Sequence, residues 1–354
     1  MRKSIFIGPI ATVTALFVAF LTLGTLGGAP SAAAKGSSGN RFNIPNVPLV
    51  THEGKTVMFY DDLIKDKKVL INFMYKTCEA TCPLSTAKLA QIQRRLGDRI
   101  GRSIFIYSIT LEPENDTPEV LKKYAEQYGA GPGWFFLTGT RENIDAVRFK
   151  LGERTEDLES HNNIIRLGTG KSWMRLTMFG DIDYLVNEIG KTLDKNWYAR
   201  TGKKAKSYAE APRLASKSLG HLMFRNRCSA CHTIGRGKHI GPDLKDVTTR
   251  RDRTWLRNYI YNPQSMRARK DPIALELFEE WDEIPMPNLE LATYEVLDLI
   301  DYLDTESRRL DKLEKAKHEG HQMGKHEGHQ KGKHGEKHGK LHDGKHEGHQ
   351  GHDG

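Results

Sequence analysis

The feature that most restricts the fold of this chain is a pair of cysteines placed directly after an apolar segment. Val69–Tyr75 has the length and composition of a buried strand, and Cys78 and Cys82 follow it just before Pro83, a residue suited to the first turn of a helix. The order predicts strand, loop and helix, with both thiols where the helix begins. The positive end of a helix stabilises thiolate, which is the form that binds metal or attacks a disulfide. We therefore expect a reactive pair rather than two inert buried cysteines.

The segments after the cysteines alternate between strand and helix patterns, which predicts an α/β layer fold with a central sheet. A hairpin across residues 168–170 and a closing helix complete this unit. The expected strands are 69–75, 103–110, 134–137, 162–167 and 173–179, and the expected helices are 83–96, 118–128, 142–151 and 182–193.

A dithiol at the end of a buried strand in such a unit indicates the thioredoxin-like class. The spacing of three intervening residues differs from the usual two, and residues 133–211 contain no proline, whereas a thioredoxin-type exchange enzyme uses a cis-proline facing its cysteines. His161 precedes the strand at 162–167, and two thiolates with one imidazole form a set that suits copper. By itself, however, a histidine before a strand is more often a surface or structural residue.

Several separate motifs together resemble the Sco/SenC family of copper-delivery proteins over roughly residues 45–195. They are Ile71–Tyr75, Cys78 and Cys82 with Pro83, Ser108–Leu111 with Asp116–Glu119, Trp134–Gly139, and the isolated His161. The resemblance implies a thioredoxin-like fold, with Cys78, Cys82 and His161 as copper ligands and the two cysteines as a redox-active pair.

The chain departs from the family pattern at two places. Glu112 stands where an aspartate before the proline is usual, and Leu167-Gly168 replaces the expected acidic residue and glycine after the histidine strand. Neither position is an expected copper ligand. The departures therefore leave the choice of partner protein open, but they do not affect the expectation of copper binding.

A second domain is predicted by the sequence Cys228-Ser-Ala-Cys231-His232, which is the attachment signature of c-type haem. Its alternative reading is a redox Cys-x-x-Cys with an accidental histidine. An electron-transfer haem needs a sixth ligand, and Met286 is favoured over Met266 because prolines on both sides hold it in an extended loop.

Residues 217–306 resemble a small all-α class I cytochrome c. The resemblance gives Cys228 and Cys231 the thioether bonds to haem c, and His232 and Met286 the axial positions. A backbone carbonyl of Gly241–Leu244 is expected to accept the second ring proton of the haem histidine. The helix at 294–303 is expected to close the domain, with Gly220 and Phe224 packed on Tyr302.

The ends of the chain and the segment between the domains have compositions of their own. Residues 1–34 are expected to be a signal peptide or a membrane anchor, and both readings place the rest outside the cytoplasm, in the periplasm or on the outer face of the membrane. Residues 196–216 are expected to be a linker. Residues 311–354 carry His-rich repeats and almost no apolar residue, which predicts a disordered tail that either stores metal near the copper domain or only solvates the chain.

The two resemblances imply a copper-binding, haem-containing accessory protein that assembles the copper centre of cytochrome c oxidase or a similar copper enzyme. The cytochrome is expected to exchange electrons with the Cys/Cys/His site, because copper and haem both change by one electron. A haem-linked thiol-disulfide reductase and a plain electron-transfer protein are the alternatives, so enzyme activity is left open. The net charge is +9, but no basic stretch interleaves with aromatic residues, which argues against a nucleic-acid partner.

Overall fold

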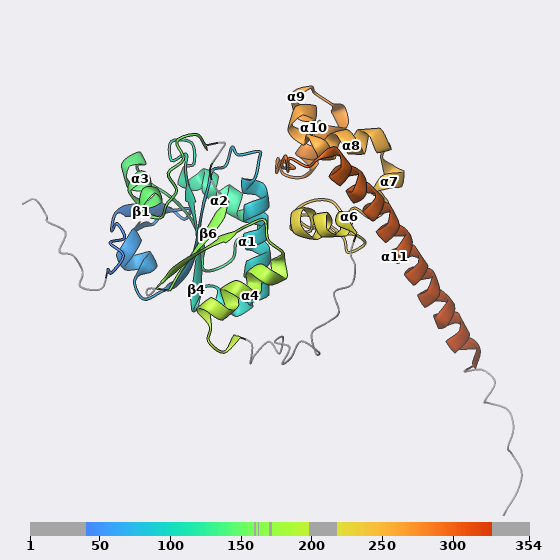
Figure 1. The fold of residues 1–354 in the computed structure, drawn as a ribbon, viewed down its shortest axis with the longest axis horizontal. Helices are drawn as coiled ribbons and strands as arrows, with labels where there is room; N and C mark the ends of the chain where they lie inside the picture. Colours follow the sequence, from blue (N-terminus) through green and yellow to red (C-terminus); the bar gives the residue numbers. More distant parts are fainter. Residues whose placement is uncertain (1–39, 159–160, 162, 170–171, 198–217, 328–354) are drawn as a thin grey trace, which may run out of the picture. The chain divides into compact units, whose positions relative to one another are not determined.

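The computed structural model describes residues 40–158, 161, 163–169, 172–197 and 218–327 of the 354-residue chain, with side chains described as far as residue 318. The segment expected to be a signal or anchor and nearly all of the expected linker lie outside the described residues. Two folded parts are present, an α/β domain and a helical domain, and each is described by itself (Figure 1).

The α/β domain is built on a seven-stranded sheet in the order β2-β1-β5-β4-β3-β6-β7. Its centre is parallel, because β3 pairs with β4 and β4 with β5 in the same direction. The outer strands are antiparallel, and β6 and β7 form the expected hairpin. The strands are β1 (Pro48–Thr51), β2 (Thr56–Met58), β3 (Lys68–Met74), β4 (Ile104–Thr110), β5 (Trp134–Thr138), β6 (Ile164–Gly168) and β7 (Trp173–Thr177).

Helices cover this sheet. Helices α1 and α4 pack on each other beside the sheet, and α3 lies on its other side in the view of Figure 1. The core side chains of β3 are buried from Val69 to Met74, as expected for a central parallel strand. The helices are α1 (Cys82–Leu96), α2 (Pro118–Gln127), α3 (Arg141–Lys150) and α4 (Ile182–Leu193), with short turns at η1 (Phe59–Ile64) and η2 (Gly97–Arg99).

The sequence signals at the helix starts behave as expected. Thr117 caps α2 by accepting a hydrogen bond from the backbone of Val120, and Pro118 takes the first helical position. Pro83 likewise lies in the first turn of α1, directly after Cys82. The Thr117 cap and Pro83 mark where the loops after the parallel strands β4 and β3 end.

The helical domain contains short helices gathered around the long α11 (Figure 1). Gly220 lies where α6 crosses α11, and a Cβ atom there would come within 2.0 Å of the Asp298 carbonyl oxygen. Phe224 packs on Tyr302 at 5.8 Å between ring centroids, which confirms the expected closing contact. The elements are α6 (Leu219–Met223), η5 (Phe224–Cys228), α7 (Val247–Arg250), α8 (Arg253–Tyr261), α9 (Pro263–Ala268), α10 (Pro272–Glu280) and α11 (Thr293–Glu327).

Helix α11 is longer than the sequence pattern predicted. Its buried residues Val296, Leu299, Ile300 and Leu303 recur at helical spacing, but the helix continues to Glu327, so the first part of the segment expected to be disordered is helical. Lys245 supports this extension with ion pairs to Asp311 at 2.9 Å and Glu314 at 3.2 Å. The rest of the His-rich segment lies outside the described residues.

Membrane-spanning helices were sought in the part of the chain that the structure describes. Among those residues, none of the helices combines the length and the apolar character needed to cross a bilayer.

Candidate functional site

The two cysteines of the α/β domain lie at the carboxyl end of β3, as the sequence predicts. Cys82 is the first residue of α1, and Cys78 lies in the preceding loop, where its backbone N–H bonds to the Tyr75 carbonyl. Both are buried, with 3% of Cys78 and none of Cys82 exposed. They are free thiols.

The surroundings separate the two thiols chemically. A hydrogen bond from Cys82, helped by the backbone N–H groups of Cys82 and Ala80, lowers the pKa of Cys78 to about 5 against the opposing effect of burial. Complete burial raises the pKa of Cys82 well above its ordinary value, and the charge on Cys78 adds to this. The apo site therefore holds one thiolate and one thiol at neutral pH.

His161 reaches the two cysteines from the loop between α3 and β6, which we call the histidine loop. Its Nε2 lies 3.2 Å from Cys82 Sγ, and its Nδ1 lies 2.8 Å from the Leu158 carbonyl oxygen. Because a carbonyl oxygen only accepts, Nδ1 carries a proton, and in the neutral ring the lone pair of Nε2 then faces the thiols. The structure thus brings His161, 5% exposed, to the cysteines.

The ligand atoms of Cys78, Cys82 and His161 all lie within 4.8 Å of one another. A metal ion placed among them would meet two sulfurs and one imidazole nitrogen in a buried, three-sided set. Sulfur favours Cu(I), and imidazole also accepts Cu(II), so the donor chemistry fits copper better than the hard, oxygen-seeking cations.

Two sets of polar contacts, one buried and one partly buried, hold the ends of the histidine loop. At its start Glu153 pairs with Arg166 of β6 at 3.5 Å, and the Glu153 side chain is fully buried. At its end Asn163 accepts a hydrogen bond from Ser85 of α1 at 2.8 Å and donates one to Thr81. The loop is therefore attached both to the sheet and to the helix that begins at Cys82.

The haem-attachment sequence of the helical domain forms a compact turn. The Cys228 carbonyl accepts hydrogen bonds from the backbone N–H groups of Cys231 and His232, at 3.0 and 2.9 Å. The His232 ring is fixed by the Pro242 carbonyl oxygen, 2.9 Å from Nδ1, which is the kind of contact the sequence predicted. Gly241 permits this approach, since a Cβ atom there would lie 2.7 Å from the ring.

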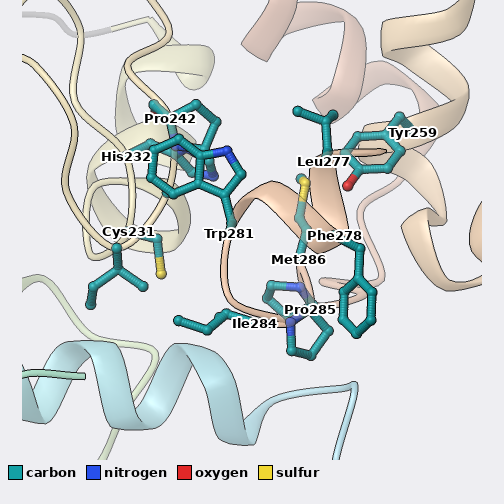
Figure 2. Close-up of a pocket in the computed structure, with 13 residues that line it drawn as sticks. Cys231, His232, Pro242, Tyr259, Leu277, Phe278, Trp281, Ile284, Pro285 and Met286 are labelled. Carbon is teal, nitrogen blue, oxygen red and sulfur yellow. Dashed lines mark hydrogen bonds between the residues drawn. The ribbon is translucent and has the colours of Figure 1, made fainter. Parts of the chain in front are cut away.

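Two adjoining cavities share His232, Pro242, Tyr259, Leu277 and Met286 in their walls. Figure 2 shows one of the two cavities, with His232 and Met286 in its wall and Trp281 drawn between them. Met266, the other candidate, lines neither cavity. The mainly apolar lining suits a haem, and the buried Trp281 Nε1 has no hydrogen-bond partner among the described residues, so a haem carboxylate would supply an acceptor.

Asp243 organises the loop that follows the haem histidine. Burial by itself raises the pKa of this carboxyl, but hydrogen bonds outweigh that effect and hold the pKa at about 2. The donors are the backbone N–H groups of Gly235, Arg236, Gly237 and Lys245 and the hydroxyl of Thr233.

Sequence reasoning missed several of these residues. Tyr75, whose hydroxyl donates to the Leu158 carbonyl oxygen at 3.3 Å, and Asp243 carry a sequence signal. Tyr75 is an aromatic residue three positions before Cys78, and Asp243 lies beside a glycine-rich turn. The Leu158 carbonyl has none, because a backbone group leaves no mark in the sequence. The pairing of Glu153 with Arg166 depends on the register of β6 and was equally hidden.

The geometry defines the class of protein as an α/β domain with a Cys/Cys/His metal site, followed by a helical domain with a haem-attachment cavity. Comparison with known families agrees with both halves. Residues 38–165 match the family model described as SCO1/SenC, and residues 218–307 match the model described as Cytochrome c. The first domain is therefore similar to the SCO1/SenC family and the second to cytochrome c, and copper and haem c are the groups that fit these two domains.

Individual relatives resemble the first domain. The SCO1 protein homolog of Bacillus subtilis is 36% identical over 88 residues, which are 25% of this chain and 44% of that protein. The SCO2-like protein of Rickettsia felis is 33% identical over 94 residues, or 27% and 44%. The chain thus spans less than half the length of these curated relatives. A solved structure of Arabidopsis thaliana ScoI with copper bound is 24% identical, covering 42% of this chain and 96% of that one, with a TM-score of 0.36.

Proposed function

We propose that this protein is an exported copper-delivery protein for the binuclear copper centre of cytochrome c oxidase or of a similar copper enzyme. The observation that carries the proposal is the meeting of Cys78, Cys82 and His161 within 4.8 Å in a buried site. Their separation in sequence makes an accidental meeting a poor explanation. The match of residues 38–165 to the SCO1/SenC family model supports the same reading.

Copper is the cargo in this proposal, and the three side chains have different tasks. Cys78 meets the ion as a thiolate, because its pKa is lowered to about 5. Cys82 loses its proton as the Cu–S bond forms, since only thiolate is a good ligand. His161 ligates through Nε2, because the Leu158 carbonyl oxygen engages Nδ1.

The cytochrome domain is proposed to exchange electrons with copper at this site. Cys228 and Cys231 would hold haem c through thioether bonds, with His232 and Met286 as the axial residues. When bound, haem c supplies a one-electron carrier, which matches the one-electron change between Cu(II) and Cu(I). The Pro242 carbonyl orients His232, and the proline-flanked loop holds Met286 at the cavity.

Residues 1–34 are proposed to direct export, and the protein is proposed to work in the periplasm or at the outer face of the membrane. The His-rich segment is proposed to hold additional copper near the delivery site.

Metal analysis combined with acceptor loading tests the proposal. The full chain and a form ending at Lys317 should both keep one copper per copper domain, whereas only the full chain should bind additional copper. This end point removes every histidine of the repeats but keeps the contacts of Lys245 to Asp311 and Glu314. His161→Ala should lose copper delivery to an oxidase copper subunit in both forms. Undiminished delivery by this variant would refute the proposal.

One observation favours a second function, a thiol-disulfide reductase. The lowered pKa of Cys78 is also what a thiol needs to attack a disulfide in a partner protein. The same His161→Ala variant separates the two functions, because dithiol exchange should persist in it while copper delivery is lost. A plain electron-transfer protein would instead keep full activity when Cys78 and Cys82 are both changed to serine.

A further inference from the structure

Three hydrogen-bond donors meet at one backbone carbonyl next to the metal site. The Leu158 oxygen accepts from His161 Nδ1 at 2.8 Å, from the His161 backbone N–H at 3.3 Å and from the Tyr75 hydroxyl at 3.3 Å. Two of the donors belong to the histidine loop itself. The third comes from the end of β3, far away in sequence, and therefore connects this loop to the sheet.

The Tyr75 ring makes a second contact with the same histidine. The two rings meet edge to face, with centroids 5.3 Å apart and an angle of 67° between their planes. Only 7% of Tyr75 is exposed, so neighbouring side chains fix its ring. The ring limits where the imidazole can lie, while the hydroxyl holds the carbonyl that decides which imidazole nitrogen carries the proton.

We propose that Tyr75 is a positioning residue for His161, acting through the Leu158 carbonyl to keep Nδ1 as the donating nitrogen and Nε2 aimed at the cysteines before any metal arrives. The proposal rests on copper ligation by His161 and deepens it. A preformed ligand set lets copper bind without first ordering the loop. It also holds the ion more tightly. Mutating the hydrogen-bond partner of a ligating histidine typically lowers metal affinity about 10- to 100-fold.

The test compares Tyr75→Phe, which keeps the ring contact and removes the hydroxyl, with Tyr107→Phe as matched control. Tyr107 is buried in β4 of the same domain, and its hydroxyl has no hydrogen-bond partner among the described residues. The first readout needs no copper. Nitrogen-15 NMR of the apo protein should show His161 protonated at Nδ1 alone in the unchanged protein and in Tyr107→Phe, and a mixture of tautomers in Tyr75→Phe.

The second readout is the release of bound Cu(II) to a chelator, followed through the sulfur-to-copper charge-transfer band. The rate of Cu(II) release from Tyr75→Phe should exceed the rate from the control by a factor of about 10 or more. An unchanged tautomer together with an unchanged release rate would overturn the inference. His161→Ala is measured alongside: if it abolishes the band while Tyr75→Phe behaves like the control, this inference fails and copper ligation stands. If His161→Ala also leaves the band intact, the proposed function itself fails.

Discussion

Cys78 and Cys82 differ in acidity although only three residues separate them. Cys78 lies before the helix, where backbone N–H groups and the Cys82 thiol point at its sulfur, whereas Cys82 is the first helical residue and has no exposed surface. The local charge of a helix start acts on both, but burial reverses its effect on the second. One thiolate is therefore present before copper binds.

This difference predicts a titration that belongs to Cys78. The thiolate ultraviolet absorbance of the reduced apo protein should be lost as the pH falls through about 5, because the pKa of Cys78 is lowered to that value. Cys82→Ala removes the hydrogen-bond donor, so the midpoint should move to higher pH, and Cys82→Ser should move it less. A midpoint that stays in place in Cys82→Ala would show that this hydrogen bond does not set the acidity.

The residue types of the site were largely predictable from the sequence, but their geometry was not. Cys78, Cys82, Cys228 and His232 stand in motifs whose spacing carries their chemistry. His161 is isolated in the sequence, and its neighbouring residues alone are more typical of a surface or structural histidine than of a metal ligand. Only the packing of its loop against Tyr75 and α1 brings it to the thiols, and such long-range packing has no local signature.

At the scale of elements, the loop from Thr233 to Lys245 shows how a short segment is held without helix or strand. The Asp243 carboxylate gathers four backbone N–H groups and one hydroxyl, and the neighbouring Pro242 carbonyl fixes His232. Asp243 thus stabilises the backbone that sets the orientation of the haem histidine.

Asp243→Asn should destabilise the helical domain by on the order of 1 kcal/mol, because an amide offers one acceptor oxygen where the carboxylate offers two. The effect should depend on pH. The folded pKa of Asp243, about 2, lies below its ordinary value of 3.8, so its stabilising contribution is complete above about pH 4 and is lost as the pH falls toward 2. Thermal unfolding should therefore show the gap between the two proteins closing in acid.

Asp246→Asn is the matched control for this measurement. Its carboxylate is 44% exposed and contacts Lys245 only at 4.0 Å, so the substitution should change stability little at any pH. If Asp246→Asn and Asp243→Asn unfold alike across the pH range, the hydrogen bonds of the Asp243 carboxylate do not stabilise the domain as described.

The predicted elements of the α/β domain were correct where apolar periodicity was strong, as in β3, β4 and α4. Strands β1 and β2 were missed because they have only four and three residues, too few to show a pattern. Helices α7 to α10 are also short and depend on packing around the haem cavity. The extension of α11 was missed because Asp311 and Glu314 owe their order in part to Lys245, a residue far from them in sequence.

At the scale of the whole molecule, one chain carries a Cys/Cys/His copper site and a cytochrome c domain. The motif order made this division predictable from sequence, since each attachment motif lies in its own stretch of periodic segments. The acceptor of copper was not predictable, because a docking surface is a property of exposed side chains that no short motif records. We therefore propose that the haem and the copper site exchange electrons, and this is the central claim.

Stopped-flow spectroscopy of the full chain tests that claim most directly. The protein is prepared with reduced haem, Cu(II) is added, and the haem bands are followed. Electron exchange between the two sites predicts haem oxidation in step with loss of the sulfur-to-copper charge-transfer band, and neither change at this rate in a Cys78→Ser, Cys82→Ser variant. Haem that stays reduced for minutes beside Cu(II) bound at Cys78, Cys82 and His161 would contradict it.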